Sequence, residues 1–287
     1  MDLRSFLQLV RAPAGLTVVG DATAGMASAG RTGIVPRLGL PVASVLLYWG
    51  GMALNDAADA ELDRVERPER PIPSGRISRR GAVGVAGALT VAGLAVAGLT
   101  GGRSSLAVAV PLAASVWTYD LVAKRGWTGP LVMGACRGLD VLLGAGRDGA
   151  AAAARPAVVM AGHTASVTTL SRGEVHGAEP ATAAVAAATT LAAGVAAVRP
   201  EPTAAGLVSI VAALRYAVPT LRAQAGAVAD PSAPVVRSAT RRGILAMVPL
   251  QAALTARAGR PVDALVLLGI DALGVVLGRR AKGREIT

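Results

Sequence analysis

The sequence has little charge and only one cysteine. Charged residues make up 16% of the 287 positions, whereas soluble domains carry about 25%. Cys136 has no partner within the chain, which excludes a disulfide scaffold. Intrinsic disorder is excluded as well, because 53% of the residues are hydrophobic and disordered chains are poor in apolar residues. With a mean hydropathy of +0.52 and its charges gathered in short stretches, the chain is predicted to be a polytopic membrane protein.

The net charge of +11 needs a separate explanation. In a soluble protein such a charge would indicate a nucleic-acid partner. Here the basic residues flank apolar segments, as orientation in a membrane requires, so we expect the lipid bilayer and no nucleic acid as a partner. Asp2 and Arg4 precede the first apolar segment and no small-residue cleavage site follows it. We therefore expect that segment to stay in the protein.

Ten apolar segments can be marked along the chain. They do not alternate as the strands of a membrane barrel do. They are rich in Ala, Gly and Val, and small residues allow membrane helices to pack closely. The sequence predicts an all-α fold, a transmembrane bundle of about nine or ten helices that forms a single domain over residues 1–287. The segments are 13–30, 38–54, 81–101, 104–121, 128–146, 156–170, 180–198, 203–221, 243–257 and 262–279.

The distribution of Lys and Arg predicts the orientation. If all ten segments cross the membrane, most basic residues fall on the side of the two termini. The positive-inside rule then places both termini in the cytoplasm of a multi-pass protein of the plasma membrane. Nine helices would leave the basic tail outside, which the rule disfavours. The three longest polar stretches, 55–80, 171–179 and 222–242, lie on the cytoplasmic side in this topology.

The stretch 55–63 carries three regularly spaced acids where the second apolar segment meets water. If the helix continues through it, Asp56, Asp59 and Asp63 fall within about 60° of one another. Carboxylates on one stripe repel each other unless a cation lies among them, and hard oxygen ligands suit Mg²⁺. A simpler interpretation stays open, in which the acids form a solvated loop with the neighbouring arginines. Those arginines are Arg64, Arg67 and Arg70.

The stretch 64–78 contains prolines at positions 68, 71 and 73. Three prolines within six residues exclude a regular helix. An extended segment would present Arg67, Arg70 and Arg76 in fixed directions, and guanidinium groups match phosphate oxygens. Ser78 is suited to cap a helix that begins near residue 79.

These two stretches together resemble the UbiA superfamily of intramembrane prenyltransferases. The spacing of the apolar segments is similar along nearly the whole chain. Tyr119 and Lys124 resemble the family's tyrosine and basic residue near the diphosphate, and Arg11 with Pro13 resembles its Arg-Pro opening. The stretch 171–177 and the compact C-terminus look most like the UbiA-like proteins of the bacterial Ebo operon. The motif that carries the resemblance is Asn55-Asp56-x-x-Asp59-x-x-x-Asp63, followed by Arg67-Pro68-x-Arg70-Pro71-Ile72-Pro73-Ser74-Gly75.

The resemblance implies an enzyme with a central cavity. Its partners would be Mg²⁺, a polyprenyl diphosphate and an aromatic or lipid-like acceptor, and it would transfer an alkyl group other than methyl. The implied metal ligands and catalytic residues are Asp56, Asp59, Asp63 and Glu174. The implied substrate-binding residues are Asn55, Arg67, Arg70, Tyr119, Lys124, Arg137 and Arg172.

The second acidic motif of the family is only partly present. Glu174 fits its middle acid, but Ser171 and Ala178 stand where acids are expected. Glu174 would then hold a second Mg²⁺ alone, with Arg172 or His176 on the diphosphate. The alternative is a non-catalytic UbiA-like membrane protein that binds or helps export a prenylated or lipophilic metabolite.

Several polar residues fall within the apolar segments, where charge is costly. Arg137 and Asp140 are three residues apart and share a helix face. They either neutralise each other or line the cavity beneath the diphosphate. His163 is interpreted as a hydrogen-bonded core histidine or as a general base. A transporter that uses Asp21 and this pair is disfavoured, because no inverted repeat is evident.

Overall fold

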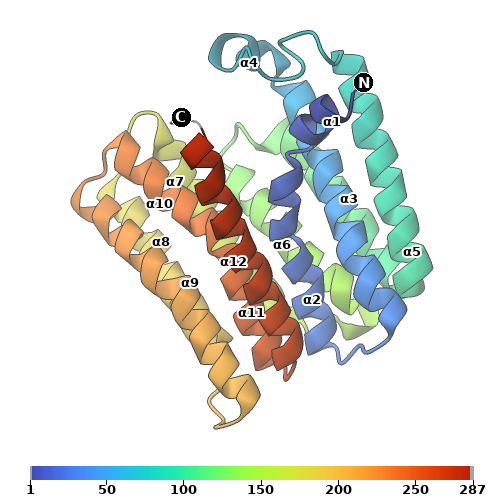
Figure 1. The fold of residues 1–287 in the computed structure, drawn as a ribbon, viewed down its shortest axis with the longest axis vertical. Coiled ribbons are helices and arrows are strands. Elements are labelled where there is room, and N and C mark those ends of the chain that lie inside the picture. Colours follow the sequence, from blue (N-terminus) through green and yellow to red (C-terminus); the bar gives the residue numbers. More distant parts are fainter. Residues whose placement is uncertain (1, 285–287) are drawn as a thin grey trace. The chain divides into compact units, whose positions relative to one another are not determined.

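A computed structural model describes residues 2–284, and the regular secondary structure of these residues is entirely helical. The chain forms two compact units, Met1–Ala165 and Ser166–Thr287. The division falls inside α7, Ala154–Ser171 (Figure 1). Each unit is described by itself, and the single domain expected from the sequence stays a prediction.

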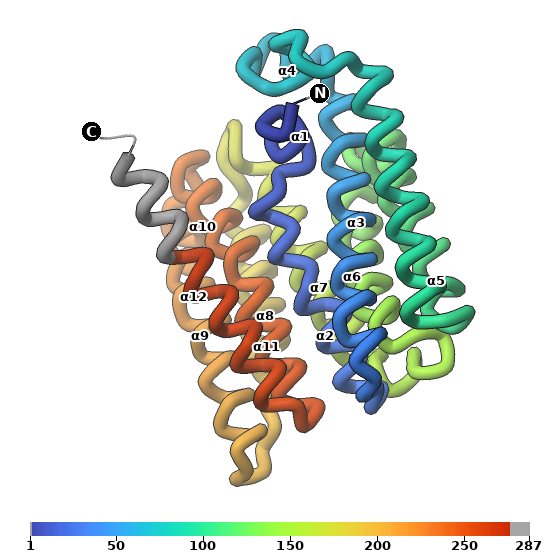
Figure 2. The backbone as a smooth tube through the Cα atoms, turned by 45° about the vertical axis from the view of Figure 1, so that its right-hand side comes forward, coloured from blue at the N-terminus to red at the C-terminus, as the bar shows by residue number. Residues whose placement is uncertain are grey.

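The first unit is built around α3, which lies between α2 and α5 (Figures 1 and 2). The short α1 precedes them, and Asp2 caps it by accepting hydrogen bonds from the amide and hydroxyl of Ser5. These hydrogen bonds lower the pKa of the Asp2 carboxyl. The helices are α1 Leu3–Leu9, α2 Val19–Ser28, α3 Ile34–Ala58, α4 Ala60–Glu66, α5 Arg79–Thr118 and α6 Gly129–Ala145. Short 3₁₀ turns cover Ala12–Thr17 and Arg147–Gly149, and a π-helical turn covers Tyr119–Ala123.

The long element α5 consists of two arms that run in opposite directions. Gly102 interrupts it with φ 71° and ψ −170°, a conformation that favours glycine. The indole Nε1 of Trp117 donates to Thr90 Oγ1 over 3.2 Å. In a straight helix residues so far apart in sequence would be separated by about 40 Å. The chain therefore reverses at Gly102, and the two apolar segments expected on either side of it are confirmed.

Helices α2 and α6 approach each other closely at two glycines. A Cβ atom at Gly25 would lie 1.8 Å from the carbonyl oxygen of Val141, and one at Gly144 would lie 1.9 Å from that of Ala22. The obstructing atoms belong to the backbone, which cannot rotate away. The absence of side chains at these positions thus sets the distance between the helices, as small residues do in membrane proteins.

The second unit surrounds α11, in which every residue from Met247 to Ala256 is buried. Helices α8, α9 and α12 contact it. The polar stretch 222–242 was expected to connect two helices, but most of it is helical because α9 continues to Ala229 and a further helix, α10, begins at Ala233. The helices are α8 Pro180–Ala197, α9 Ala204–Ala229, α10 Ala233–Leu245, α11 Met247–Arg257 and α12 Pro261–Arg284.

In the described part of the chain, four helical elements are long and apolar enough to cross a membrane. Several large apolar residues on them, such as Val91 and Leu99 on α5 and Leu207 on α9, are exposed, while acids such as Asp21 are buried. Apolar residues on the surface and acids in the interior are the reverse of the distribution in a soluble protein, and this arrangement suits a lipid environment. Helices α1, α4 and α10 were not among the ten expected segments. The four elements are Ile34–Ala58, Arg79–Ala123, Pro180–Ala197 and Ala204–Ala229.

The contact between α2 and α6 yields a test of the fold. We expect Gly144→Ala to lower the free energy of unfolding by about 1–3 kcal/mol, because the new methyl group meets the backbone of Ala22. The matched control is Gly84→Ala on α5, where nothing lies within 4 Å of the added carbon. The measurement is the midpoint of thermal unfolding in detergent. Equal midpoints for the two variants would contradict the close packing.

Candidate functional site

The three spaced acids lie where α3 gives way to α4. Asp59 occupies the junction with φ −93° and ψ 8°. The hydrogen-bond spacing of a helix is nevertheless kept across it, because the Asp59 amide donates to Asn55 O at 2.9 Å and the Asp63 amide to Asp59 O at 2.8 Å. The acids therefore remain about one helical turn apart, as the sequence predicts.

Each of the three acids lies against a cationic side chain. Asp56 and Asp63 share Arg70, whose Nη1 is 3.4 Å from Asp56 Oδ1 and 2.6 Å from Asp63 Oδ2. Asp59 is directed elsewhere and pairs with Lys124 Nζ at 2.6 Å. The expected stripe thus divides into a pair of carboxylates on one guanidinium and a third carboxylate on an ammonium group.

The segment that presents Arg70 is a fixed turn. It lies outside the helices, as its prolines predict. The Ser74 hydroxyl and amide donate to the Arg70 carbonyl oxygen at 2.6 and 3.0 Å. Arg76 donates to Glu69 O at 2.7 Å. Ser78 caps α5 as expected, by accepting from the Gly81 amide at 3.0 Å.

Two basic residues outside the expected set also reach these acids. Arg11 Nη2 lies 2.8 Å from Asp56 Oδ1. Arg11 lies between α1 and the following 3₁₀ turn, and its backbone has φ 47°, which is uncommon for a residue other than glycine. Arg125 Nη2 is 3.8 Å from Asp59 Oδ1. The Arg-Pro opening was the sequence signal for Arg11, whereas nothing local distinguished Arg125.

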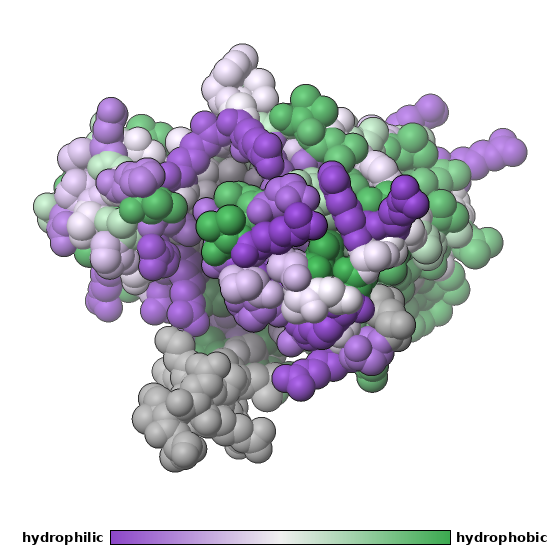
Figure 3. Space-filling model, turned by 90° about the horizontal axis from the view of Figure 1, so that it is seen from above, coloured by the Kyte–Doolittle hydropathy of each residue, from purple (hydrophilic) through white to green (hydrophobic). Residues whose placement is uncertain are grey.

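Arg67 makes the loosest of these contacts. Its Nη1 is 3.6 Å from Asp63 Oδ1, and its side chain is half exposed. Figure 3 looks onto the end of the molecule where α1 and α4 lie, and strongly hydrophilic residues gather over it. Among the residues in contact here the cations outnumber the acids, so this end of the unit favours an anion.

Asp120 is a buried acid beside this cluster that the sequence interpretation passed over. It lies in the π-helical turn Tyr119–Ala123 and is 3% exposed. The amide group of Asn55 donates to its Oδ1 at 2.9 Å. π-Helical turns inside helices occur frequently at functional sites. The turn also carries Tyr119 and leads directly to Lys124, so it links both residues to the end of α3.

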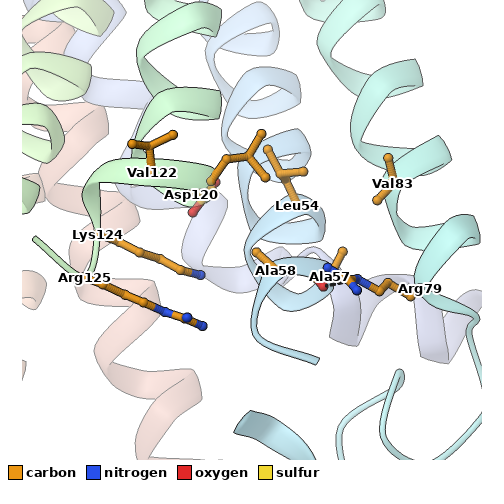
Figure 4. A pocket seen from close by; sticks show the side chains of 10 residues that line it. Leu54, Ala57, Ala58, Arg79, Val83, Asp120, Val122, Lys124 and Arg125 are labelled. Atoms are coloured by element: carbon orange, nitrogen blue, oxygen red, sulfur yellow. Dashed lines mark hydrogen bonds between the residues drawn. The ribbon is translucent and has the colours of Figure 1, made fainter. Parts of the chain in front are cut away.

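Two cavities meet at Asp120. The larger has a volume of about 210 Å³, lies between α3, α5 and the π-helical turn, and is shown in Figure 4. Arg79, Lys124 and Arg125 contribute its positive charge, and Arg79 Nε donates to Ala57 O at 2.9 Å. The smaller cavity has a volume of about 90 Å³ and is mainly apolar. Asp120 lines both of them.

Arg137 lines the smaller cavity, and its ion pair differs from the one expected. Its Nη1 lies 3.0 Å from Asp21 Oδ2, and its Nη2 donates to Thr17 O at 2.8 Å. Asp140 instead accepts a hydrogen bond from the Ser44 hydroxyl at 2.6 Å. The partner of Arg137 comes from α2, which is distant in sequence, and the i, i+3 spacing on α6 does not reveal it.

Arg172 and Glu174 belong to the second unit. They form a 3₁₀ turn directly after α7. Arg172 is exposed and Glu174 is half-buried. The guanidinium of Arg237 donates to the Glu174 carbonyl oxygen at 2.9 Å and ties the turn to α10.

The acids of the first unit suit Mg²⁺ in one particular way. In the described part of the chain, no three acidic, His or Cys side chains come together to hold a metal by themselves. Mg²⁺ usually binds one or two carboxylates together with phosphate oxygens and waters. Asp56 and Asp63 provide such a pair, and Asp63 Oδ1 is buried without accepting a hydrogen bond from any described residue. The donor chemistry therefore fits the ion.

Named relatives match part of the chain. A digeranylgeranylglyceryl phosphate synthase from Methanoculleus marisnigri is 40% identical over 126 residues, which cover 44% of this chain and 44% of that protein. The 33 kDa chain of a bacteriochlorophyll synthase from Cereibacter sphaeroides is 34% identical over 113 residues, 38% of this chain and 37% of that one. The chain thus matches less than half the length of these relatives.

Solved structures extend the likeness to most of the fold. A digeranylgeranylglyceryl phosphate synthase structure superposes with a TM-score of 0.61 at 19% identity, covering 89% of this chain and 98% of that one. A UbiA homologue from Archaeoglobus fulgidus, bound to GPP and Mg²⁺, gives 0.56 at 14% identity and covers 87% and 99%.

The family comparison covers the acids, the proline-containing turn, the π-helical turn and α6. The model of the UbiA prenyltransferase family matches residues 16–171, more than half of the sequence. The chain belongs to the UbiA prenyltransferase family.

Proposed function

We propose that the chain transfers a prenyl group from a prenyl diphosphate to a lipophilic acceptor within the membrane, with Mg²⁺ as cofactor. The observation that carries the proposal is the cluster of Asp56, Asp59 and Asp63, in which each carboxylate lies against a cation at the end of an apolar helix. The names of the relatives support it, since they denote synthases of prenylated products. The GPP and Mg²⁺ bound to the Archaeoglobus fulgidus homologue support the substrate class and the ion.

The cations of the cluster are suited to hold the diphosphate. Arg70 and Lys124 now neutralise acids, with side chains only 19% and 12% exposed. A diphosphate offers them more oxygen atoms in a similarly charged group, and the fork of Arg70 matches phosphate geometry. Once these cations turn to phosphate, Asp56 and Asp63 become available as ligands of Mg²⁺. Bound there, the ion would neutralise the charge that builds up on the leaving diphosphate.

In the reaction, the bond between the prenyl carbon and the diphosphate oxygen breaks, and the diphosphate leaves with the electron pair. An electron pair of the acceptor forms the new bond to the prenyl carbon, and the acceptor loses a proton to solvent or to the departing diphosphate. Having turned to the phosphate, Arg70 and Lys124 stabilise that charge in a place largely removed from water. Asn55 holds Asp120 at the boundary of the two cavities. The apolar walls around Leu54 and Val83 exclude water, which would otherwise compete with the acceptor for the prenyl group.

The second acidic motif contributes less in this proposal. Glu174 supplies one carboxylate and Arg172 one guanidinium, on a turn of the second unit. Arg67 and Tyr119 complete the substrate contacts.

We propose that the acidic stretches face the cytoplasm at the plasma membrane. The narrower likeness to the proteins of the Ebo operon stays a prediction.

A second prediction concerns the acids. We expect the double variant Asp56→Asn/Asp59→Asn to weaken Mg²⁺-dependent binding of geranylgeranyl diphosphate by roughly 100-fold or more, because it removes the charge of one carboxylate of the proposed metal-binding pair and of the carboxylate that positions Lys124. The measurement is equilibrium binding to the purified protein in detergent, with and without Mg²⁺. The matched control is Glu61→Gln on α4, an exposed acid paired with Arg64, which should leave binding unchanged.

Unchanged binding in the double variant, with its unfolding midpoint preserved, would contradict the proposed role of these acids. Metal-dependent binding in the native chain without transfer to any acceptor would favour the non-catalytic alternative.

A third prediction separates the roles of two adjacent cations. We expect Lys124→Gln to weaken diphosphate binding about 10- to 100-fold, because a nearly buried charged donor is removed. Arg125→Gln should change binding less than about threefold, since its side chain is 75% exposed and screened by water. The dissociation constants of both variants at fixed Mg²⁺ concentration check this order, and the reverse order would refute it.

A further inference from the structure

The larger cavity of the first unit lies on a different face of α3 from the acids that the proposed function uses for the metal. Leu54, Ala57 and Ala58 are the residues of α3 that line it. At about 100° per residue, the side chain of Asp56 leaves the helix about 150° away from the middle of these three. Asp56 accordingly pairs with Arg70, which is not among the residues that line the cavity. The cavity is therefore a separate place on the molecule.

Three cations reach this cavity from two sides. Figure 4 shows Lys124 and Arg125 extending side by side from the chain that follows the π-helical turn, with Arg79 of α5 opposite them. The Nε atom of Arg79 donates to Ala57 O at 2.9 Å, so a neutral partner holds this guanidinium at the cavity. The cationic side chains thus converge on the end of α3.

The positive charge of the cavity exceeds what the neighbouring acids balance. Asp59 lies close to only one of the cations, Lys124 at 2.6 Å, because Arg125 is 3.8 Å from it and 75% exposed. Arg79 forms no ion pair with an acid in the described part of the chain. Asp120 is the one acid among the residues that line the cavity, where it faces three cations. An anion is therefore favoured here, and guanidinium groups match phosphate oxygens.

The edge of the cavity is apolar and exposed. Val83 on α5 is 40% exposed, and Leu121 and Val122 on the π-helical turn are 58% and 76% exposed. Both ends of the candidate membrane-crossing element Arg79–Ala123 meet at this cavity, which places it at the depth of lipid headgroups. Cations beside exposed apolar side chains at such a depth suit an anionic headgroup joined to an acyl chain. A soluble anion would leave the apolar edge unused.

We propose that the larger cavity binds an anionic phospholipid of the bilayer, with Arg79 and Arg125 on its phosphate and an acyl chain against Leu121 and Val122. The bound lipid covers the mouth of the cavity beside Lys124 and keeps water from that side chain. This inference goes beyond the proposed function, because it assigns a ligand that is neither donor nor acceptor of the prenyl group.

The test measures lipid binding directly. The purified full chain in detergent is titrated with dioleoylphosphatidylglycerol, and bound lipid is counted by native mass spectrometry. Dioleoylphosphatidylcholine has the same chains without a net charge, and glycerol 3-phosphate has the phosphate without the chains. We expect phosphatidylglycerol to bind at least about 10-fold more tightly than either probe. Equal binding of phosphatidylcholine would overturn the inference, as would equal binding of glycerol 3-phosphate, which would assign the cavity to a soluble anion.

A pair of double variants makes the test specific to the cavity. Arg79→Gln/Arg125→Gln should weaken phosphatidylglycerol binding about 10-fold or more, because both guanidinium groups proposed for the phosphate are lost. The matched control is Arg103→Gln/Arg147→Gln, which removes the same charge from two exposed arginines outside the cavity and should leave binding unchanged. All four arginines are exposed, and the midpoint of thermal unfolding verifies that both variants fold. Equal losses in the two double variants would overturn the inference, because only the overall charge would then matter.

Binding of geranylgeranyl diphosphate with Mg²⁺ is measured on the same variants to separate this site from the proposed function. A loss in Arg79→Gln/Arg125→Gln as large as the loss of lipid binding would assign the cavity to the diphosphate. That result would overturn the inference while the proposed function stands. Selective binding of phosphatidylglycerol by a native chain that binds no geranylgeranyl diphosphate would support the lipid site and contradict the proposed function.

Discussion

The ion pairs that Arg70 makes with Asp56 and Asp63 connect the local structure of the first unit to its chemistry. Two carboxylates one or two turns apart on a helix repel each other, and burial makes that repulsion costly. One guanidinium from the proline-containing turn relieves it and, in doing so, fixes the turn over the end of α3. In the proposed function, substrate replaces these ion pairs. A metal ion takes the place of the guanidinium beside the two carboxylates, and a diphosphate takes the place of the carboxylates beside the guanidinium. In the proposed function, the stability of the unliganded site and the binding of substrate thus depend on the same charged groups.

Charge balance of this kind is possible only because the apolar helices pack without much side-chain volume. The backbone of α6 approaches that of α2 at Gly25 and Gly144, and the neighbouring Asp21 and Arg137 then lie close enough to pair across the two helices. Polar groups at membrane depth are costly unless they find partners in the protein. The close approach of the helices supplies those partners. The small residues of the sequence therefore allow the close packing that lets the buried charges pair.

Much of this structure could be predicted where the determinants are local. The prolines between Arg67 and Ser74 exclude a helix, Ser78 caps the next one, and the spacing of the acids follows helical turns. The division of the acids between Arg70 and Lys124 could not be predicted, because Lys124 comes from another element and its approach depends on packing. The partner of Arg137 was missed for the same reason, since spacing on α6 suggested Asp140 and the fold supplied Asp21. The helix α10 was missed because its sequence is polar and lacks a clear apolar segment.

The reversal of α5 at Gly102 also bears on how the protein enters a membrane. Because the two arms run in opposite directions, Arg79 at the beginning of α5 and Lys124, just after the π-helical turn that follows α5, line one cavity. A helical hairpin can insert as a unit with its glycine bend leading, and its arms satisfy their own backbone hydrogen bonds throughout. The charged groups at its base then never cross the hydrocarbon layer. Two cationic residues of the cavity wall thereby flank a single helical hairpin.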